Sequence, residues 1–274
     1  MKFAICNEIF KGWKLDAIFS HAAQLGYKGV ELAPFTIADS VTQVSLKERG
    51  QIRDAAERHG IEIVGLHWLL VKPEGLSLNH PDAGIRGRTA EYFAELVNFC
   101  ADLGGKVLVV GSPKQRNLMA GISREQGAVW ALETLKPCVE IAESREVAVC
   151  LEPLAPAETN FINTAAEAIE LVRRADSPAL RIILDVKAMC AEAKAIPEII
   201  RESFPYFPHF HANDRNLKGP GFGEVDFVPI AAALREVGYG GWVSVEVFRF
   251  EEGPETIAAK SIEYLRRVFG ASSR

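Results

Sequence analysis

Four apolar segments in the second half of the chain each end at a side chain that can bind a metal ion. The segments cover residues 147–152, 180–185, 207–211 and 242–246. Their last residues are Glu152, Asp185, His211 and Glu246. Successive members of this set are about 30 residues apart, which is the length of one strand–helix unit. The spacing predicts four consecutive strands that present these side chains at one edge of a sheet or barrel.

The four side chains suit a divalent cation. Three carboxylates held close together repel one another and take up protons unless a cation lies among them. Three oxygen ligands and one imidazole match a hard or borderline ion in octahedral coordination, with positions left for water or substrate. We therefore predict a metal site of Glu152, Asp185, His211 and Glu246, with Mn²⁺ expected and Mg²⁺ or Co²⁺ as alternatives. A single carboxylate at a strand end is often only a helix N-cap or a salt-bridge partner. His209 is predicted to be a hydrogen-bonded core histidine, with a residue that supports the metal ligands as the alternative.

The whole chain alternates short strand-like runs with longer amphipathic stretches. Strands are predicted at residues 3–6, 28–32, 61–66, 106–110, 147–151, 180–184, 207–211 and 243–245. Helices are predicted at residues 14–25, 46–58, 86–103, 124–144, 164–174, 196–203, 227–237 and 255–269, with a kink or break at Pro137. Eight such units without a change in composition predict an α/β fold, a single (β/α)8 TIM barrel over residues 1–274. An open doubly wound sheet is the alternative, although residues 7–11 lack its glycine-rich phosphate turn.

Composition narrows the class of protein. The formal net charge of −5 offers no basic footprint for nucleic acid. The five cysteines are widely spaced and form no CxxC pair, so we expect reduced thiols and a cytoplasmic location. No signal-peptide pattern opens the chain, and no apolar run reaches the roughly 18 residues of a membrane span.

The same segments resemble the xylose isomerase-like barrel superfamily, specifically its sugar phosphate isomerase/epimerase group, which includes ketose 3-epimerases. The matching segments are Leu151–Leu154, Leu184–Asp185, His209–Asp214, Gly219–Asp226 and Ser244–Glu246. The run Gly-Pro-Gly-Phe-Gly-Glu-Val-Asp at 219–226 is the most specific of them. The resemblance implies that Glu152, Asp185, His211 and Glu246 are the metal ligands. It also implies that Glu152 and Glu246 are the catalytic residues, which move a proton at a carbon next to a carbonyl.

The resemblance implies substrate contacts as well. Glu158, in the loop after the fifth strand, and Arg215, after the seventh, lie where members of the family bind substrate. His67 ends the third strand and is a further candidate, with a satisfied buried histidine as the alternative. Members commonly carry a histidine three residues after the sixth-strand aspartate, but this chain has Ala188 there. Lys187 is expected to replace its polar role, or the substrate differs from an ordinary ketose.

The predicted function is a metal-dependent sugar isomerase or epimerase that works through a metal-stabilised enediolate. The alternative is a lyase that uses the same residues for β-elimination on a keto-sugar, keto-inositol or 3-oxo-glycoside. A DNA-repair barrel would need more than the six histidines present and a less negative charge. A non-catalytic sugar-binding barrel is disfavoured because all four ligands are intact. Relatives imply a homo-oligomer, either a dimer or a tetramer, with a small carbohydrate as partner and neither nucleic acid nor membrane.

Overall fold

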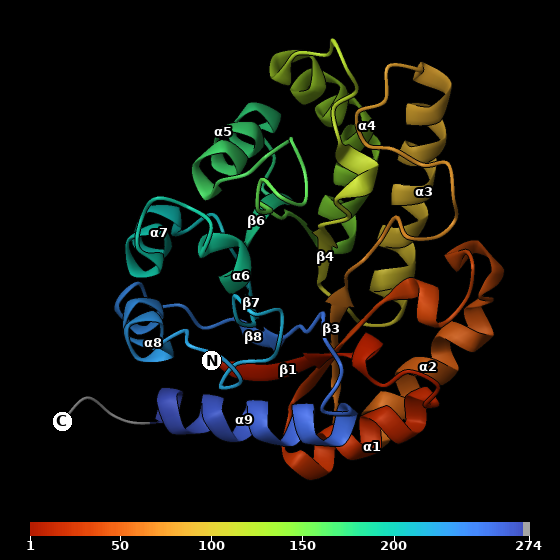
Figure 1. Cartoon of the computed structure of the whole chain (residues 1–274). Helices are drawn as coiled ribbons and strands as arrows, with labels where there is room; N and C mark the ends of the chain where they lie inside the picture. The colour runs from red at the N-terminus through yellow and green to blue at the C-terminus, as the bar shows by residue number, and fades with distance from the viewer. Residues whose placement is uncertain (271–274) are drawn as a thin grey trace.

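The computed structural model describes residues 1–270, in which eight parallel strands close into a barrel (Figure 1). The strands are β1 (Lys2–Cys6), β2 (Gly29–Leu32), β3 (Glu62–Leu66), β4 (Val107–Val110), β5 (Ala148–Leu151), β6 (Leu180–Asp185), β7 (His209–Ala212) and β8 (Trp242–Val245). Each strand pairs with its neighbours in chain order, and β1 pairs with β8 to close the ring. The predicted α/β barrel is confirmed and the open sheet is excluded. That residues 1–274 form one domain stays a prediction.

The long helices are arranged around the outside of the strands (Figure 1). They are α1 (Leu15–Leu25), α2 (Leu46–Arg58), α3 (Ala83–Asp102), α4 (Arg124–Arg145), α5 (Ala165–Ala175), α7 (Ile196–Ser203), α8 (Phe227–Glu236) and α9 (Pro254–Gly270). Several begin at side-chain caps that the sequence indicates. Ser45 accepts a hydrogen bond from the backbone of Glu48 at the start of α2, and Thr164 accepts one from Glu167 at the start of α5.

The structure corrects one local prediction, at Pro137, and adds one short helix that the sequence did not indicate. Pro137 lies inside α4, which continues from Arg124 to Arg145, so the predicted break there is wrong. One missing N–H donor is tolerated because residues around it, including Leu135 and Cys138, are fully buried and hold the helix by packing. The short helix α6 (Val186–Met189) directly after β6 was not predicted. Four residues give too little periodicity for a sequence pattern to detect.

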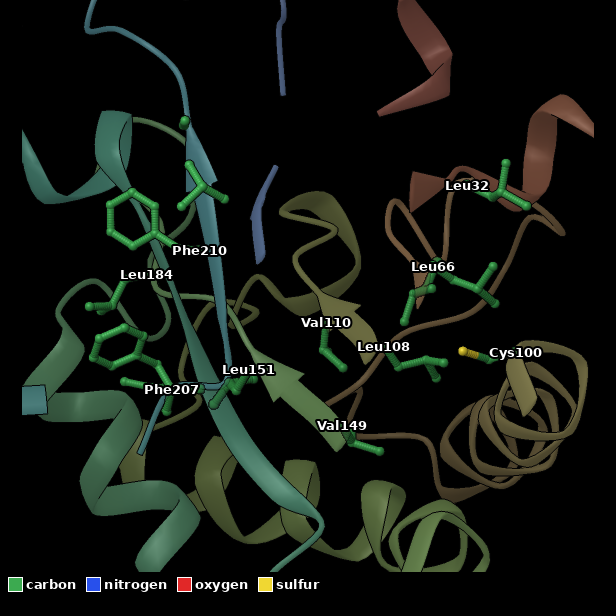
Figure 2. Packing of buried hydrophobic residues seen from close by; sticks show 14 of the residues in the cluster. Leu32, Leu66, Cys100, Leu108, Val110, Val149, Leu151, Leu184, Phe207 and Phe210 are labelled. Carbon is green, nitrogen blue, oxygen red and sulfur yellow. The ribbon is translucent and has the colours of Figure 1, made fainter. Parts of the chain in front are cut away.

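Alternation along the strands separates the outer core from the barrel interior. Leu108, Val110, Val149 and Leu151 belong to the large cluster that packs between strands and helices (Figure 2). Val107, Val109, Cys150 and Ile183, one residue out of phase, form a separate buried cluster. Successive side chains of a strand point to opposite faces. Glu152 and Asp185 continue the phase of Cys150 and Ile183, so both point into the barrel at its carboxyl end.

Candidate metal centre and active site

The four predicted metal ligands meet at the carboxyl ends of β5 to β8. One ligand atom each from Glu152, Asp185, His211 and Glu246 lies within 4.8 Å of the others. All four side chains are almost fully buried. The Nδ1 atom of His211 is 3.1 Å from Oε2 of Glu246 and 3.7 Å from Oε1 of Glu152. The register of the barrel produces this convergence, because Asp185 pairs directly with His211 across β6 and β7.

Asp185 has a structural role together with its place in this cluster. It is the N-cap of α6, where Oδ1 accepts a hydrogen bond from the backbone N–H of Ala188 at 2.7 Å. Its Oδ2 accepts one from Nδ2 of Asn213 at 2.5 Å. Both oxygens are therefore oriented by the protein, which fixes the direction of the carboxylate before any ion binds.

The side chains of the cluster carry more negative than positive charge. Burial raises the pKa of Glu152 to about 7, and burial also raises the pKa of Asp185. Burial would raise the pKa of Glu246 too, but the neighbouring His211 holds it below its ordinary value. Burial opposes a charge on His211, yet Glu246 and Glu31 raise its pKa well above the usual range. The imidazole of His211 can therefore offset only part of the negative charge of these buried acids.

The donor set fits a divalent cation. Although His211 Nδ1 and Glu246 Oε2 are 3.1 Å apart, each lacks a hydrogen-bond partner among the described residues. Buried polar atoms are seldom left unpartnered unless a ligand or ion completes them. Three carboxylates and one imidazole aimed at one point provide the ligands and the negative charge that such an ion needs.

A second layer lies directly inside the barrel, beneath the cluster. Glu31, at the end of β2, has Oε2 at 2.8 Å from Nε2 of His209, and both its oxygens lie 3.2 Å from Nε2 of His211. Burial alone would raise the pKa of Glu31, but the two histidines lower it well below its ordinary value. His209 is a hydrogen-bonded core histidine as predicted. Glu31 was missed, although it ends a strand-like run just as the four predicted ligands do.

Another acidic group, also missed, lies beside the cluster. Glu8, in the 3-10 turn η1 (Asn7–Ile9) after β1, has Oε2 at 3.0 Å from Nε2 of His67. Nδ1 of His67 lies 4.0 Å from Oε1 of Glu246. Burial raises the pKa of Glu8 well above its usual value and lowers the pKa of His67. His67 is fully buried, within reach of the candidate metal centre.

Two of the remaining predicted substrate contacts pair with each other. Nζ of Lys187 is 2.7 Å from Oε1 of Glu158 and 4.0 Å from the centre of the Phe248 ring. Burial opposes the charge of Lys187, but Asp185 and Glu158 raise its pKa above the ordinary value. Lys187 is therefore a buried cation next to the cluster.

Arg215 lies elsewhere. It is exposed, and its guanidinium donates only a 3.4 Å hydrogen bond to the carbonyl of Cys190 within residues 1–270. The chain turns at Asp214, whose carboxylate accepts a hydrogen bond from the backbone of Val225 at 3.0 Å. This turn directs Arg215 to the surface, and its contact with a substrate stays a prediction.

Two glycines near the site leave room for neighbouring carboxylates. A Cβ atom on Gly111, after β4, would collide with Oε2 of Glu152, so only glycine leaves that carboxylate in place. A Cβ on Gly223 would collide with the carboxylate of Asp214. Asp226, the last residue of the glycine-rich run, is the N-cap of α8. The most specific matching run therefore builds the loop after β7 and contributes no ligand to the cluster.

Neither disulfides nor a membrane helix are found in the described part of the chain. All five cysteines are free thiols. Within residues 1–270, no helix combines the length and the apolar character needed to cross a bilayer.

Comparisons with known proteins agree with the fold. A family model described as xylose isomerase-like TIM barrel matches residues 19–268. A probable ketose 3-epimerase of Synechocystis sp. is 26% identical over 98% of this chain and 97% of its own length. A D-psicose 3-epimerase of Ruminiclostridium cellulolyticum is 26% identical over 86% of this chain and 80% of its own. A crystal structure of a D-psicose 3-epimerase in the presence of D-fructose superposes with a TM-score of 0.86 at 22% identity, covering 99% of this chain and 100% of that one.

Proposed function

The chain belongs to the xylose isomerase-like TIM-barrel family, and from this premise we propose that it is a metal-dependent sugar epimerase. The substrate is a ketose or a related keto-sugar, and the reaction inverts a carbon next to the carbonyl by removing and returning its proton. Two relatives that cover most of the chain have names that specify ketose or D-psicose 3-epimerases, which supports this class of reaction.

One observation carries the proposal. Glu152 and Glu246 come from strands on either side of β6 and β7, yet their carboxylates meet in one buried cluster with Asp185 and His211. Inversion needs one group that accepts a proton from the carbon and another that donates a proton from the opposite side. The cluster contains two carboxylates that approach its centre from different strands, so each can serve one face of a substrate bound there. Two carboxyl groups placed in this way suit the roles of acid and base.

The residues have separate tasks in this scheme. Glu152, Asp185, His211 and Glu246 would hold the divalent cation, for which we propose Mn²⁺. When bound, such an ion polarises the substrate carbonyl and offsets the negative charge of the enediolate. Glu246 accepts the proton from the reacting carbon. Glu152 delivers a proton to the other face, and burial of both side chains keeps bulk water away from the intermediate.

Deuterium incorporation tests the function. The purified protein with added Mn²⁺ is incubated with individual ketoses in D₂O, and the sugars are followed by NMR. We expect deuterium at the carbon next to the carbonyl in both epimers. Glu152→Gln and Glu246→Gln should each lower the rate by about 10²–10⁴-fold, whereas Glu62→Gln on the exposed end of β3 should not. Asp185→Asn should lose Mn²⁺ on dialysis. Equal rates for the two active-site variants and the control would refute the assignment.

The same experiment separates the epimerase from the lyase. Elimination releases water or an aglycone and gives an unsaturated product, whereas epimerisation conserves the formula and incorporates one deuterium. A cytoplasmic location and a dimeric or tetrameric assembly complete the proposal; free thiols are in keeping with the first, and light scattering of the purified protein tests the second.

A further inference from the structure

Buried polar atoms without partners belong to residues that directly follow β1 and β3, where Glu8 and His67 lie beside the candidate metal centre. They comprise both carboxylate oxygens of Glu8, both ring nitrogens of His67 and the indole nitrogen Nε1 of Trp68. His67 is completely buried, and the Glu8 side chain is only 8% exposed. Such atoms are rare in folded proteins, and each calls for a specific explanation. Several within one corner of an active site indicate a polar ligand that completes them.

The geometry of His67 indicates what kind of ligand fits. Glu8 approaches one edge of the ring, with Oε2 at 3.0 Å from Nε2, although neither atom has a hydrogen-bond partner among the described residues. On the other side, Nδ1 and Oε1 of Glu246 are 4.0 Å apart, which is too long for a direct hydrogen bond. A single hydroxyl oxygen can lie about 2.8 Å from both atoms at once. It would exchange one hydrogen bond with the imidazole and one with the carboxylate.

Trp68, the next residue in the chain, adds an aromatic surface to this part of the site. It has a left-handed backbone, with φ of 52°, which is costly for a bulky side chain and tends to occur at functional sites. Its ring lies 6.1 Å from that of Phe248, which in turn covers Lys187. This surface therefore combines aromatic faces with the unpartnered Nε1 donor, a combination suited to a sugar, whose C–H faces and hydroxyl groups alternate.

We propose that Glu8, His67 and Trp68 form a subsite that binds a hydroxyl group on the sugar chain beyond the reacting carbon. The proposal rests on the proposed function, because Glu246 as proton acceptor places the reacting carbon next to this corner. It assigns a substrate class: keto-sugars that keep a free hydroxyl on the carbon adjacent to the one that is inverted. For a 2-ketose inverted at carbon 3, this is the hydroxyl on carbon 4.

Other occupants fit less well. An apolar or deoxy group would leave all three side chains unsatisfied in a dry environment, which is unfavourable. A second cation would need Glu8, His67 and Glu246 to turn toward one point, and their ligand atoms do lie within 4.8 Å of one another. However, an ion bound there would lie beside the proposed cation, and it would occupy the oxygen of Glu246 that faces the subsite.

The test compares D-fructose with 4-deoxy-D-fructose in the deuterium-exchange assay, with Mn²⁺ present. For the wild-type protein we expect a KM about tenfold lower for D-fructose, corresponding to one hydrogen-bonded hydroxyl. Glu8→Leu removes the carboxylate at similar size and should bring the ratio of the two KM values close to one. Glu8→Gln keeps the hydrogen-bonding capacity and should restore most of the ratio. Trp68→Phe removes only the indole donor and should reduce the ratio several-fold.

The outcomes separate this inference from the proposed function. Exchange in both sugars with equal KM values, or a ratio that survives in Glu8→Leu, overturns the subsite and leaves the epimerase standing. No exchange in any ketose overturns both. Calorimetric titration with Mn²⁺ covers the remaining alternative: two ions per wild-type chain and one per Glu8→Leu chain would overturn the hydroxyl subsite in favour of a second cation. If Glu8→Leu fails to fold, the wild-type ratio and Glu8→Gln still decide the matter.

Discussion

Glu31 holds the ring of His211 from inside the barrel. Both carboxylate oxygens of Glu31 lie 3.2 Å from Nε2 of the imidazole, so the opposite nitrogen, Nδ1, faces Glu246 and Glu152. The two residues are 180 positions apart in the chain. A carboxylate behind a metal-binding histidine orients the ring and makes it a better ligand.

Glu31→Gln should therefore weaken Mn²⁺ binding by about 10–100-fold, because the amide no longer provides a negative charge to the ring of His211. Calorimetric titration of the metal-free protein measures this directly. Glu62→Gln, the same substitution on the exposed end of β3, serves as the matched control. An unchanged dissociation constant in Glu31→Gln would show that His211 does not depend on this contact.

Asn213→Ala should damage both stability and metal binding. The side chain of Asn213 is fully buried, donates to Asp185 and accepts from the backbone N–H of Lys187 at 2.7 Å. Its removal leaves a buried carboxylate oxygen without a donor, at a cost of about 1–3 kcal/mol. Urea unfolding and Mn²⁺ titration measure the two effects. Asn216→Ala in the exposed part of the same loop should change neither by a comparable amount.

Gly111→Ala should displace Glu152 and spare the fold. The added methyl group would collide with the end of a flexible side chain, which can move aside without disturbing the backbone. We expect weaker Mn²⁺ binding and slower turnover with little change in unfolding free energy. Gly50→Ala in α2 meets nothing within 4 Å and should instead stabilise the protein by about 0.5–1 kcal/mol. Normal metal binding in Gly111→Ala would contradict this account of the glycine.

The Lys187–Glu158 pair should show energetic coupling. Lys187 is nearly buried and Glu158 is 28% exposed, with Nζ and Oε1 2.7 Å apart. A double-mutant cycle with Lys187→Met and Glu158→Gln should give a coupling energy of about 1–2 kcal/mol in urea unfolding. If the two single effects simply add, the pair contributes nothing to stability, and both residues are then free to engage a substrate independently.

Stability should depend on pH through Asp102 at the end of α3. Burial would raise the pKa of Asp102, but hydrogen bonds from Arg49 and Arg145 hold it below its ordinary value of 3.8. The folded state therefore binds a proton less tightly than the unfolded state. The ionised carboxylate of Asp102 therefore contributes to stability above about pH 4. This contribution is lost as the pH falls through the lowered pKa.

Asp102→Asn should destabilise the protein at pH 7 by about 1–2 kcal/mol, because the charged hydrogen bonds from Arg49 and Arg145 are lost. Arg49 is only 9% exposed and its Nη1 lies 2.8 Å from Oδ2 of Asp102. The difference from wild type should shrink below pH 4. Chemical denaturation at several pH values measures it, with Asp54→Asn on the exposed face of α2 as the control. If the difference in unfolding free energy between wild type and Asp102→Asn stays constant down to pH 3, the lowered pKa of Asp102 is contradicted.

Much of the site was predictable because parallel strands in chain order bring their carboxyl ends to one edge. Period-two alternation then places Glu152, Asp185, His211 and Glu246 on the inner face. The same reasoning applies to Glu31, which also ends a strand, but its strand lies on the other side of the barrel. Nothing local in the sequence distinguishes an acid that faces the cluster from one that supports a ligand below it.

The amino-acid sequence by itself determined the barrel and the convergence of Glu152, Asp185, His211 and Glu246, because both follow from strand–helix periodicity and the common direction of the strands. Only the tertiary structure decided which groups touch across the interior. Closure of β1 on β8 and the register of the ring bring Glu8, Glu31 and His67 against residues of β7 and β8, and the turn at Asp214 sends Arg215 outward. Such contacts depend on the shape of the closed barrel, which couples residues far apart in the chain and leaves no local pattern in either segment.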